Sequence, residues 1–345
     1  MGKLSWLLVA VPLSIAAKLA HLPTAAFVLS IVGIVPLAGV IGRGTEDLAI
    51  HSGSRIGGLI NATFANLAEL IIGIFLIVGG QIEVVKVSII GSIIGNILLV
   101  LGAAFLLGGL KFREQSFNPR LAGMHSASLA LAVVGIMMPA IFHRVSPSAG
   151  LVVDESVSAA VAAILILLYV ASLVFSFVTH QEFFATHEVT GPAGWSKRKA
   201  LFMLLGAAVV VAIESEVLVS SLESATAALH LSKLFVGLIL VPIVGNAAEN
   251  SSAIVLALKN KVDVSLEIAI GSSTQIALFV APLLVFVSLI VGHPMNFFFT
   301  GFEIAAVGIS TAIVSLICLD GRSNWLEGAQ LIAAYLIMGI SSFFL

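Results

Sequence analysis

Long apolar stretches separated by short polar connections run the whole length of the chain. A helix that crosses a bilayer needs roughly 17–25 mostly apolar residues, and eleven stretches meet that requirement. The predicted helices cover residues 4–20, 24–42, 57–79, 84–109, 123–142, 158–179, 200–222, 232–257, 263–290, 298–319 and 326–344. This pattern predicts an all-α polytopic membrane protein with about eleven transmembrane helices.

Composition supports the same class of protein. Of the 345 residues, 59% are hydrophobic and 10% are charged, whereas soluble proteins carry about 25% charged residues. The formal net charge of −2 gives no reason to expect a nucleic-acid partner. Cys318 is the one cysteine, so a disulfide framework or a cysteine-based metal site is not expected.

The positions of Lys and Arg predict how the helices are oriented. Positive side chains are enriched in cytoplasmic connections. With the N-terminus inside, twelve lie on the inner side, namely Lys3, Arg43, Arg55, Lys111, Arg113, Arg120, Lys197, Arg198, Lys199, Lys259, Lys261 and Arg322. Four lie on the outer side, namely Lys18, Lys86, Arg144 and Lys233. The bias predicts a cytoplasmic N-terminus and an outer C-terminus.

Two halves of the chain carry the same polar motif. Residues 61–69 read NATFANLAE and residues 241–249, which lie 180 positions later, read VPIVGNAAE. Apart from the first predicted helix, which is extra, five predicted helices precede the polar connection between the halves and five follow it. Because five is odd, the halves enter the membrane in opposite senses, as in transporters with inverted repeats and a site near the bilayer midplane. The predicted parts are a leading helix (1–22), a first repeat (23–180), a cytoplasmic linker (181–199) and a second repeat (200–345).

The repeated motif places oxygen ligands inside predicted membrane helices. Asn66 and Glu69 are three residues apart, as are Asn246 and Glu249, so each pair shares a helix face. Ionisable residues inside a membrane are rare unless they handle an ion or a proton. Further oxygen-bearing side chains that we expect to line the site or a proton path are Ser92, Asn96, Ser252, Ser272 and Gln275. Such a ligand set suits a hard cation such as Ca²⁺.

The two carboxylates also suggest how exchange would work. Two ionised glutamates close together in a low dielectric repel each other, and they relieve the repulsion by binding a divalent cation or by taking up protons. These occupancies exclude each other, which is the requirement for an antiporter. The titrations of the two glutamates would be coupled, so the apparent pKa values belong to the pair and not to either residue.

The two motifs resemble those of a known family. The runs GGLINATFANLAELI (57–71) and VGNAAENSSAI (244–254) are similar to the repeat motifs of calcium/proton exchangers, within the calcium/cation antiporter superfamily. The resemblance extends to GSIIGN (91–96), GSSTQIALFVAP (271–282) and NWLEGAQLIAAY (324–335). It implies one leading helix followed by two inverted halves of five, and Ca²⁺ export or sequestration driven by proton flow.

The same resemblance implies roles for individual residues. By it, Glu69 and Glu249 carry the transported ion, with Asn66 and Asn246 beside them. The side chains implied to belong to polar helices facing the site are Ser92, Ser272 and Gln275. Three departures from the family pattern are Ala65 in place of Gly, Asn250 in place of His, and an interrepeat linker without an acidic run.

Several alternatives remain open at this point. A Na⁺-coupled or broader-specificity cation exchanger of the same superfamily is the main alternative, and a passive channel is a second. An enzyme is not expected, because the chain lacks an HExxH zinc motif. The expected partners are Ca²⁺, H⁺ and the lipid bilayer, with Ca²⁺ as transported substrate and no cofactor. Short loops favour a prokaryotic plasma membrane, and the oligomeric state is open, a homo-oligomer included.

Three acidic side chains outside the motifs have competing interpretations. Glu214 and Glu216 lie toward the expected outer end of the helix at 200–222, where they could line a vestibule or be ordinary interfacial charges. For Glu303, a helix-packing or interface role is favoured over a role in transport.

Overall fold

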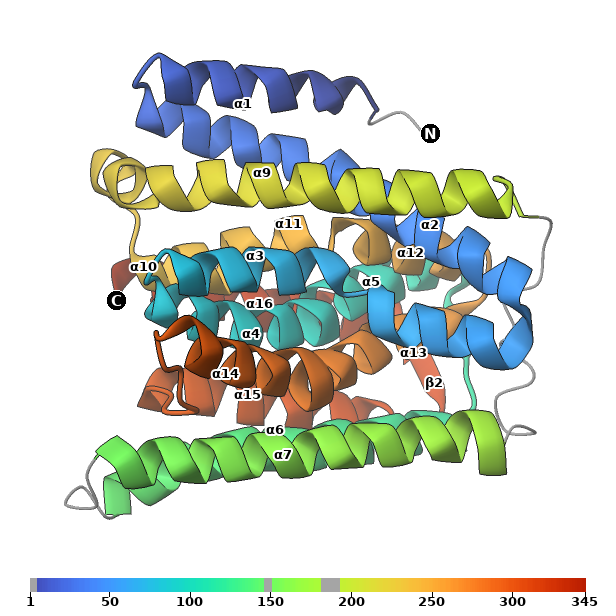
Figure 1. Ribbon diagram of the computed structural model, residues 1–345. Helices are drawn as coiled ribbons and strands as arrows, with labels where there is room; N and C mark the ends of the chain where they lie inside the picture. The colour runs from blue at the N-terminus through green and yellow to red at the C-terminus, as the bar shows by residue number, and fades with distance from the viewer. Residues whose placement is uncertain (1–4, 146–150, 181–192) are drawn as a thin grey trace. The chain divides into compact units, whose positions relative to one another are not determined.

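The computed structural model describes residues 5–145, 151–180 and 193–345. Within these ranges the chain is almost entirely helical, apart from one antiparallel ribbon of two short strands (Figure 1). The strands are β1 (Glu114–Ser116) and β2 (Arg322–Asn324), and Gln115 lies opposite Ser323. The prediction of an all-α polytopic class is confirmed, because eight of the described helices are long and apolar enough to cross a membrane.

The helices follow in chain order. Those before residue 181 are η1 (Ser5–Val9), α1 (Ala10–Leu19), α2 (Pro23–Phe64), α3 (Leu67–Val78), α4 (Ile82–Ile94), η2 (Gly95–Val100), α5 (Leu101–Phe112), α6 (Pro119–Val145), α7 (Leu151–Val174) and η3 (Phe175–Thr179). Those after it are α9 (Lys197–Leu229), α10 (Lys233–Phe235), η5 (Val236–Leu240), α11 (Val241–Gly245), α12 (Ala247–Ala257), α13 (Val262–Gln275), η6 (Ile276–Val280), α14 (Ala281–Val291), α15 (Gly301–Ile317) and α16 (Trp325–Phe344). The segments η2, η3, η5 and η6 are π-helical.

The break expected between residues 42 and 57 is present, because Pro23–Gly53 and Ile56–Val78 are separate candidate spans, but it lies at Gly53, so the first helix extends well beyond residue 42. Helix α2 continues through this polar segment, and its backbone breaks only at Gly53, where φ is +78°. Residues Leu37, Ile41 and Leu48 are all buried at helical spacing, so the apolar face of the helix persists beside the polar residues. The polar residues of this segment therefore belong to a helix and not to a loop.

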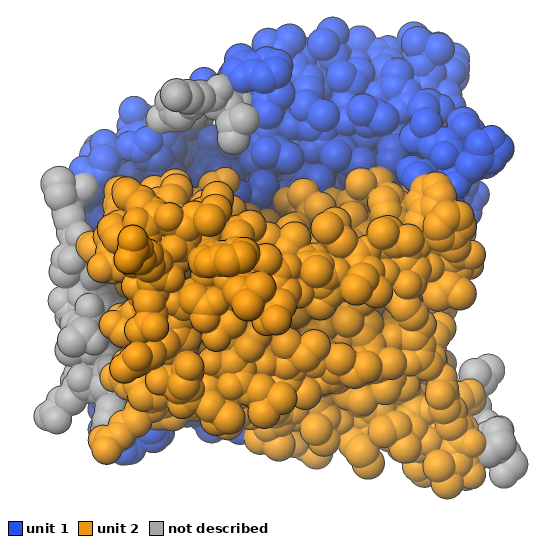
Figure 2. All heavy atoms as spheres, turned by 180° about the vertical axis from the view of Figure 1, so that it is seen from behind, with its two compact units in different colours: residues 1–81, 167–231, 244–248 blue, residues 82–166, 232–243, 249–345 orange. Residues whose placement is uncertain are grey.

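The described chain divides into two compact units (Figure 2). The first comprises residues 1–81, 167–231 and 244–248, and the second comprises residues 82–166, 232–243 and 249–345.

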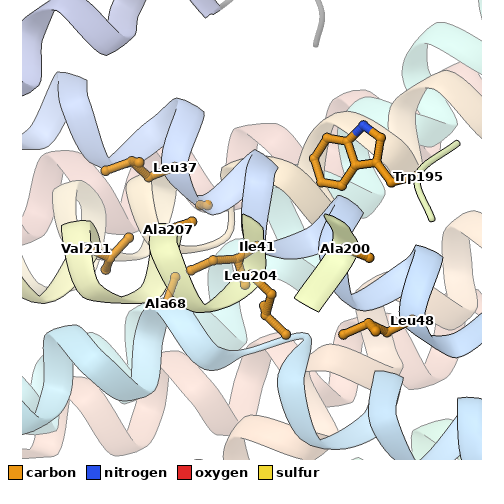
Figure 3. Packing of buried hydrophobic residues seen from close by; sticks show 10 residues of the cluster. Leu37, Ile41, Leu48, Ala68, Trp195, Ala200, Leu204, Ala207 and Val211 are labelled. Atoms are coloured by element: carbon orange, nitrogen blue, oxygen red, sulfur yellow. The ribbon is translucent and has the colours of Figure 1, made fainter. Parts of the chain in front are cut away.

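In the first unit, α2 lies along α9, and both pack against α1 (Figure 1). Apolar side chains of α9 recur at intervals of three and four residues, so they form one stripe along the helix. The stripe meets α2, α3 and the indole of Trp195 (Figure 3). The buried members of this cluster are Leu37, Ala38, Ile41, Leu48, Ala68, Trp195, Ala200, Leu204, Ala207 and Val211.

The segment that leads into α9 is fastened to α2 by polar contacts. The carboxylate of Asp47 accepts the backbone N–H groups of Gly194 at 2.7 Å and of Trp195 at 3.1 Å. A ring nitrogen of His51 lies 2.8 Å from the carbonyl oxygen of Trp195. The guanidinium of Arg43 lies over the indole, 4.7 Å from its centroid. The predicted linker ends here, and its residues 181–192 fall outside the described part of the chain.

Substituting Asp47 by Ala is expected to lower the free energy of unfolding by about 2–4 kcal/mol. Loss of the carboxylate would leave two backbone donors without their acceptor, one of them on the buried Trp195. Thermal unfolding in detergent measures the effect. Glu216→Ala is the control, because Glu216 forms an exposed ion pair with Lys18 at 2.6 Å, and exposed pairs contribute about 0–1 kcal/mol. Equal losses for both variants would contradict the assignment.

In the second unit, α4 packs closely on η5, and α5 packs on α16. Helices α15 and α16 begin with reciprocal caps, in which Thr300 pairs with Glu303 and Asn324 pairs with Glu327. Such capping boxes satisfy backbone N–H groups at helix starts. The capping residue of α16, Asn324, is the last residue of β2, so the ribbon fixes where this helix begins.

Candidate functional site

The first motif lies at a helix discontinuity. Helix α2 ends at Phe64, and Asn66 occupies the position directly before α3, with φ of −92° and ψ of 27°. The Asn66 side chain is buried, and Glu69 is half-buried in the first turn of α3. The N-terminal turn of a helix carries a partial positive charge, which stabilises a carboxylate there.

The second motif repeats this local arrangement. Asn246 is buried between α11 and α12, and Glu249 lies in the first turn of α12. The helical segments Lys233–Gly245 and Glu249–Ala257 meet at a bend of 67°. Each motif therefore places its Asn at a break and its Glu at the start of the next helix. Broken helices with free backbone groups are the usual setting of ion sites in transporters.

Within the first unit, the carboxylate of the first motif approaches the backbone of the second. A Cβ atom at Gly245 would lie 3.0 Å from Cγ of Glu69 and 3.2 Å from its Oε1. Glycine permits this close approach, and the neighbouring residue in the chain is Asn246. The structure thus brings Glu69 beside Gly245 of the other motif, which lies 176 positions away in the sequence.

Within the second unit, the Ser272 hydroxyl hydrogen-bonds the carboxylate of Glu249. Ser92 in α4 and Asn96 in η2 are buried, Gln275 at the end of α13 is half-buried, and Ser252 in α12 is exposed. Asn96 lies in one π-helical segment, and Gln275 immediately precedes another. π-Helical turns are frequent at functional sites. Glu69 is described in the first unit and Glu249 in the second, so a shared site for both stays a prediction.

The side chains of the two motifs offer oxygen atoms. Among the described residues, no group of three or more His, Cys, Asp or Glu side chains stands close enough to hold a metal ion. Carboxylate, amide and hydroxyl oxygens, supplemented by backbone carbonyls at helix breaks, are ligands that Ca²⁺ prefers. The chemistry of this donor set fits a hard cation as transported substrate.

The acidic residues outside the motifs have other roles or surroundings. Glu303 belongs to the cap of α15, where its carboxylate accepts the Thr300 N–H at 2.6 Å, so this side chain stabilises the start of its own helix. Glu214 does not lie toward the end of its helix, where it was expected either to line a vestibule or to be an interfacial charge. This side chain is fully buried and accepts the Ser14 hydroxyl at 2.7 Å. Helix α9 extends to Leu229, beyond the expected end at 222, and this places Glu214 near its middle.

If Glu69 binds a transported cation, as its motif predicts, Gly245→Ala is expected to raise the KM for that cation with little change in protein yield. The added methyl would press on the Glu69 carboxylate, whose movement is easier than that of a backbone atom. Gly206→Ala is the control, since no atom lies within 4 Å of the added Cβ. Initial rates of uptake at varied cation concentration measure the effect. A wild-type KM for Gly245→Ala would show that the close approach has no bearing on the ion site.

Comparison with known proteins decides the family. The family described as sodium/calcium exchanger protein matches residues 22–178 and 199–344. The chain belongs to this family. The match includes both motifs, and the resemblance drawn from their residues is confirmed.

Individual relatives match over almost the whole chain. The Ca(2+)/H(+) antiporter of Aphanothece halophytica is 42% identical over 355 residues, which cover 98% of this chain and 95% of the relative. The Ca(2+)/H(+) antiporter ChaA of Bacillus subtilis (strain 168) is 44% identical over 355 residues and covers all of both chains. The solved structure of native YfkE matches with a TM-score of 0.88 and 41% identity, covering 99% of this chain and 100% of that chain.

Proposed function

We propose that this chain is a secondary antiporter that exchanges Ca²⁺ for H⁺ across a membrane by alternating access. The observation that carries the proposal is identity above 40%, over the full length, with proteins named Ca(2+)/H(+) antiporters. The two motifs supply the chemistry, because each presents a carboxylate in the first turn of a helix beside a buried asparagine. The proposed activity is transport, with Ca²⁺ as substrate.

In this proposal Glu69 and Glu249 bind either Ca²⁺ or protons, and Asn66 and Asn246 supply amide oxygens. Charge explains why the ions alternate. Two glutamates neutralise one divalent cation, whereas in its absence their mutual repulsion favours protonation. The hydrogen bond from Ser272 orients one carboxylate oxygen of Glu249. Ser92, Asn96, Ser252 and Gln275 are proposed to line the site or the proton path.

The proposed architecture has eleven membrane spans. They comprise the eight long helices, the bent pair counted as one span, and the shorter apolar helices Ser5–Leu19 and Gly301–Ile317. The proposed organisation is a leading helix (1–22), inverted repeats at 23–180 and 200–345, and a linker at 181–199.

A pair of contacts in the second unit supports the repeats. The Asp263 carboxylate accepts the backbone N–H of Asn118 at 2.7 Å. The Lys86 ammonium donates to the carbonyl of Phe298 at 2.8 Å and pairs with Glu83 at 3.1 Å. A shift of 180 positions converts Asn118 into Phe298 and Glu83 into Asp263. Segments 180 positions apart are therefore held near the starts of two helices that also begin 180 positions apart, which supports the proposed repeats.

The location follows from the same arguments. The chain is an integral membrane protein, and bacterial relatives point to a plasma membrane. The distribution of Lys and Arg supports a cytoplasmic N-terminus and an outer C-terminus.

Ca²⁺ uptake into proteoliposomes tests the proposal against its alternatives. Vesicles that are acidic inside should take up Ca²⁺ without Na⁺, and dissipating the pH gradient should stop the uptake. An imposed Na⁺ gradient at equal pH should give none. Uptake that depends on Na⁺ would instead support a Na⁺-coupled exchanger, and Ca²⁺ flux without proton counterflow would support a channel.

A further inference from the structure

One face of α12 is held by a series of polar contacts. Glu249, Ala253 and Ala257 are spaced by four residues, so they lie above one another along the helix. The Glu249 carboxylate receives the Ser272 hydroxyl. The carbonyl of Ala253 accepts the Ser265 hydroxyl at 2.7 Å, and the carbonyl of Ala257 accepts the Gln115 side-chain amide at 2.9 Å. All of these donors belong to α13 or β1 in the second unit.

The side chains that donate these hydrogen bonds lie along one face of α13 and on the ribbon of β1 and β2. Ser265 and Ser272 are seven residues apart, which is two turns of one helix face. Ser265 is fully buried, and its hydroxyl is closer to Ala253 than to the carbonyl of Lys261 in its own turn, at 3.3 Å. Its stronger bond therefore joins two helices. Gln115 is also buried and donates at 2.9 Å to the side chain of Asn260.

Comparing the two repeats shows which of these hydrogen-bond donors are present in both. The position equivalent to Ser272 is Ser92, which retains the hydroxyl expected at the ion site. The position equivalent to Ser265 is Val85, and the position equivalent to Gln115 is Met295. Neither can donate a comparable hydrogen bond. The helix that carries Glu249 thus receives two hydrogen bonds for which the helix that carries Glu69 has no equivalent donor.

We propose that Ser265 and Gln115 are positioning residues that hold α12 in one register on α13, and thereby hold Glu249 against Ser272 for ion binding. Sliding α12 along α13 would leave the buried hydroxyl of Ser265 and the buried amide of Gln115 without their inter-helix acceptors. The register is stabilised independently of the ion. This proposal rests on the proposed function, in which Glu249 binds the transported ion.

Ser265→Ala and Gln115→Leu test the proposal, with Ser310→Ala as a matched control. Ser310 is equally buried, but its hydroxyl bonds the carbonyl of Ala306 in its own helix at 2.6 Å, and its contact with another helix is a weak one to the sulfur of Met338 at 3.6 Å. Each test variant is expected to raise the KM for Ca²⁺ roughly three- to tenfold, because one net hydrogen bond corresponds to about that factor. Vmax should stay close to the wild-type value. Hydrogen–deuterium exchange of the backbone should increase within α12, whereas Ser310→Ala should change neither KM nor this exchange.

The possible outcomes distinguish failure of the positioning role from failure of the proposed function. A wild-type KM and unchanged exchange in α12 for Ser265→Ala would overturn the positioning role. So would a KM change of the same size for Ser310→Ala, because general loosening of buried serines would then explain both. If the wild-type protein fails to take up Ca²⁺ under a pH gradient, the proposed function fails. Exchange in α12 still decides whether Ser265 fixes the helix, because it is measured without transport.

Discussion

Glu69→Gln and Glu249→Gln are each expected to abolish Ca²⁺ uptake driven by a pH gradient. Glutamine keeps the size of the side chain but carries no negative charge and takes up no proton. One remaining carboxylate cannot balance a dication, and removing one partner of a buried charge pair costs about 3–5 kcal/mol. That free energy corresponds to a loss of more than roughly hundredfold in affinity. Uptake into acidic-inside proteoliposomes measures the effect.

Glu214→Gln is the matched control for these substitutions. Glu214 is also a buried glutamate near the middle of a long helix, but it lies outside both motifs. The amide oxygen of glutamine can still accept the Ser14 hydroxyl. We therefore expect near wild-type uptake from Glu214→Gln. Robust proton-driven uptake by Glu69→Gln or Glu249→Gln would contradict their assignment, and its loss in all three variants would show that the assay responds to any buried glutamate.

Gly91→Ala is expected to destabilise the folded protein strongly. Helix α4 crosses η5 so closely that a Cβ at Gly91 would collide with the carbonyl oxygen of Leu238 and lie 2.8 Å from its carbon. Backbone atoms cannot move aside as a flexible side chain can. Overpacking of this kind costs about 1–3 kcal/mol or more. We expect a low yield of folded protein and a lower melting temperature in detergent.

The repeat provides the control for this substitution. Gly271 lies 180 positions after Gly91, and no atom lies within 4 Å of a Cβ placed there. Gly271→Ala should therefore fold with a melting temperature close to that of the wild-type protein. Similar melting temperatures for Gly91→Ala and the wild-type protein would contradict the close packing of α4 on η5.

Much of the fold class could be predicted from the sequence, because apolar stretches long enough to cross a membrane leave few alternatives. The run of α2 through residues 43–53 could not. Its polar residues predict a connection, and only contacts with distant segments show why the helix continues. Asp47 holds the backbone of Gly194 and Trp195, which lie almost 150 positions away. No local pattern reveals such a partner.

The candidate site divides in the same way. The spacing of Asn66 and Glu69 is repeated at Asn246 and Glu249. This local signal led to the prediction that the two glutamates bind the ion. The role of Glu303 was also readable, because Thr300 three residues earlier completes a capping-box pattern. The burial of Glu214 and the contact of Ser265 with Ala253 depend on packing between helices, which hydrophobic periodicity alone does not specify.

The central claim is that Ca²⁺ and protons compete for the same two carboxylates. Proton release on Ca²⁺ addition tests it most directly, measured with a pH indicator on purified protein in weakly buffered detergent solution. The wild-type protein should release protons as Ca²⁺ binds, and its Ca²⁺ affinity should fall as the pH is lowered. The variant with both Glu69→Gln and Glu249→Gln should release none. Saturable Ca²⁺ binding by the wild-type protein without proton release at every pH at which the protein is folded would contradict the account.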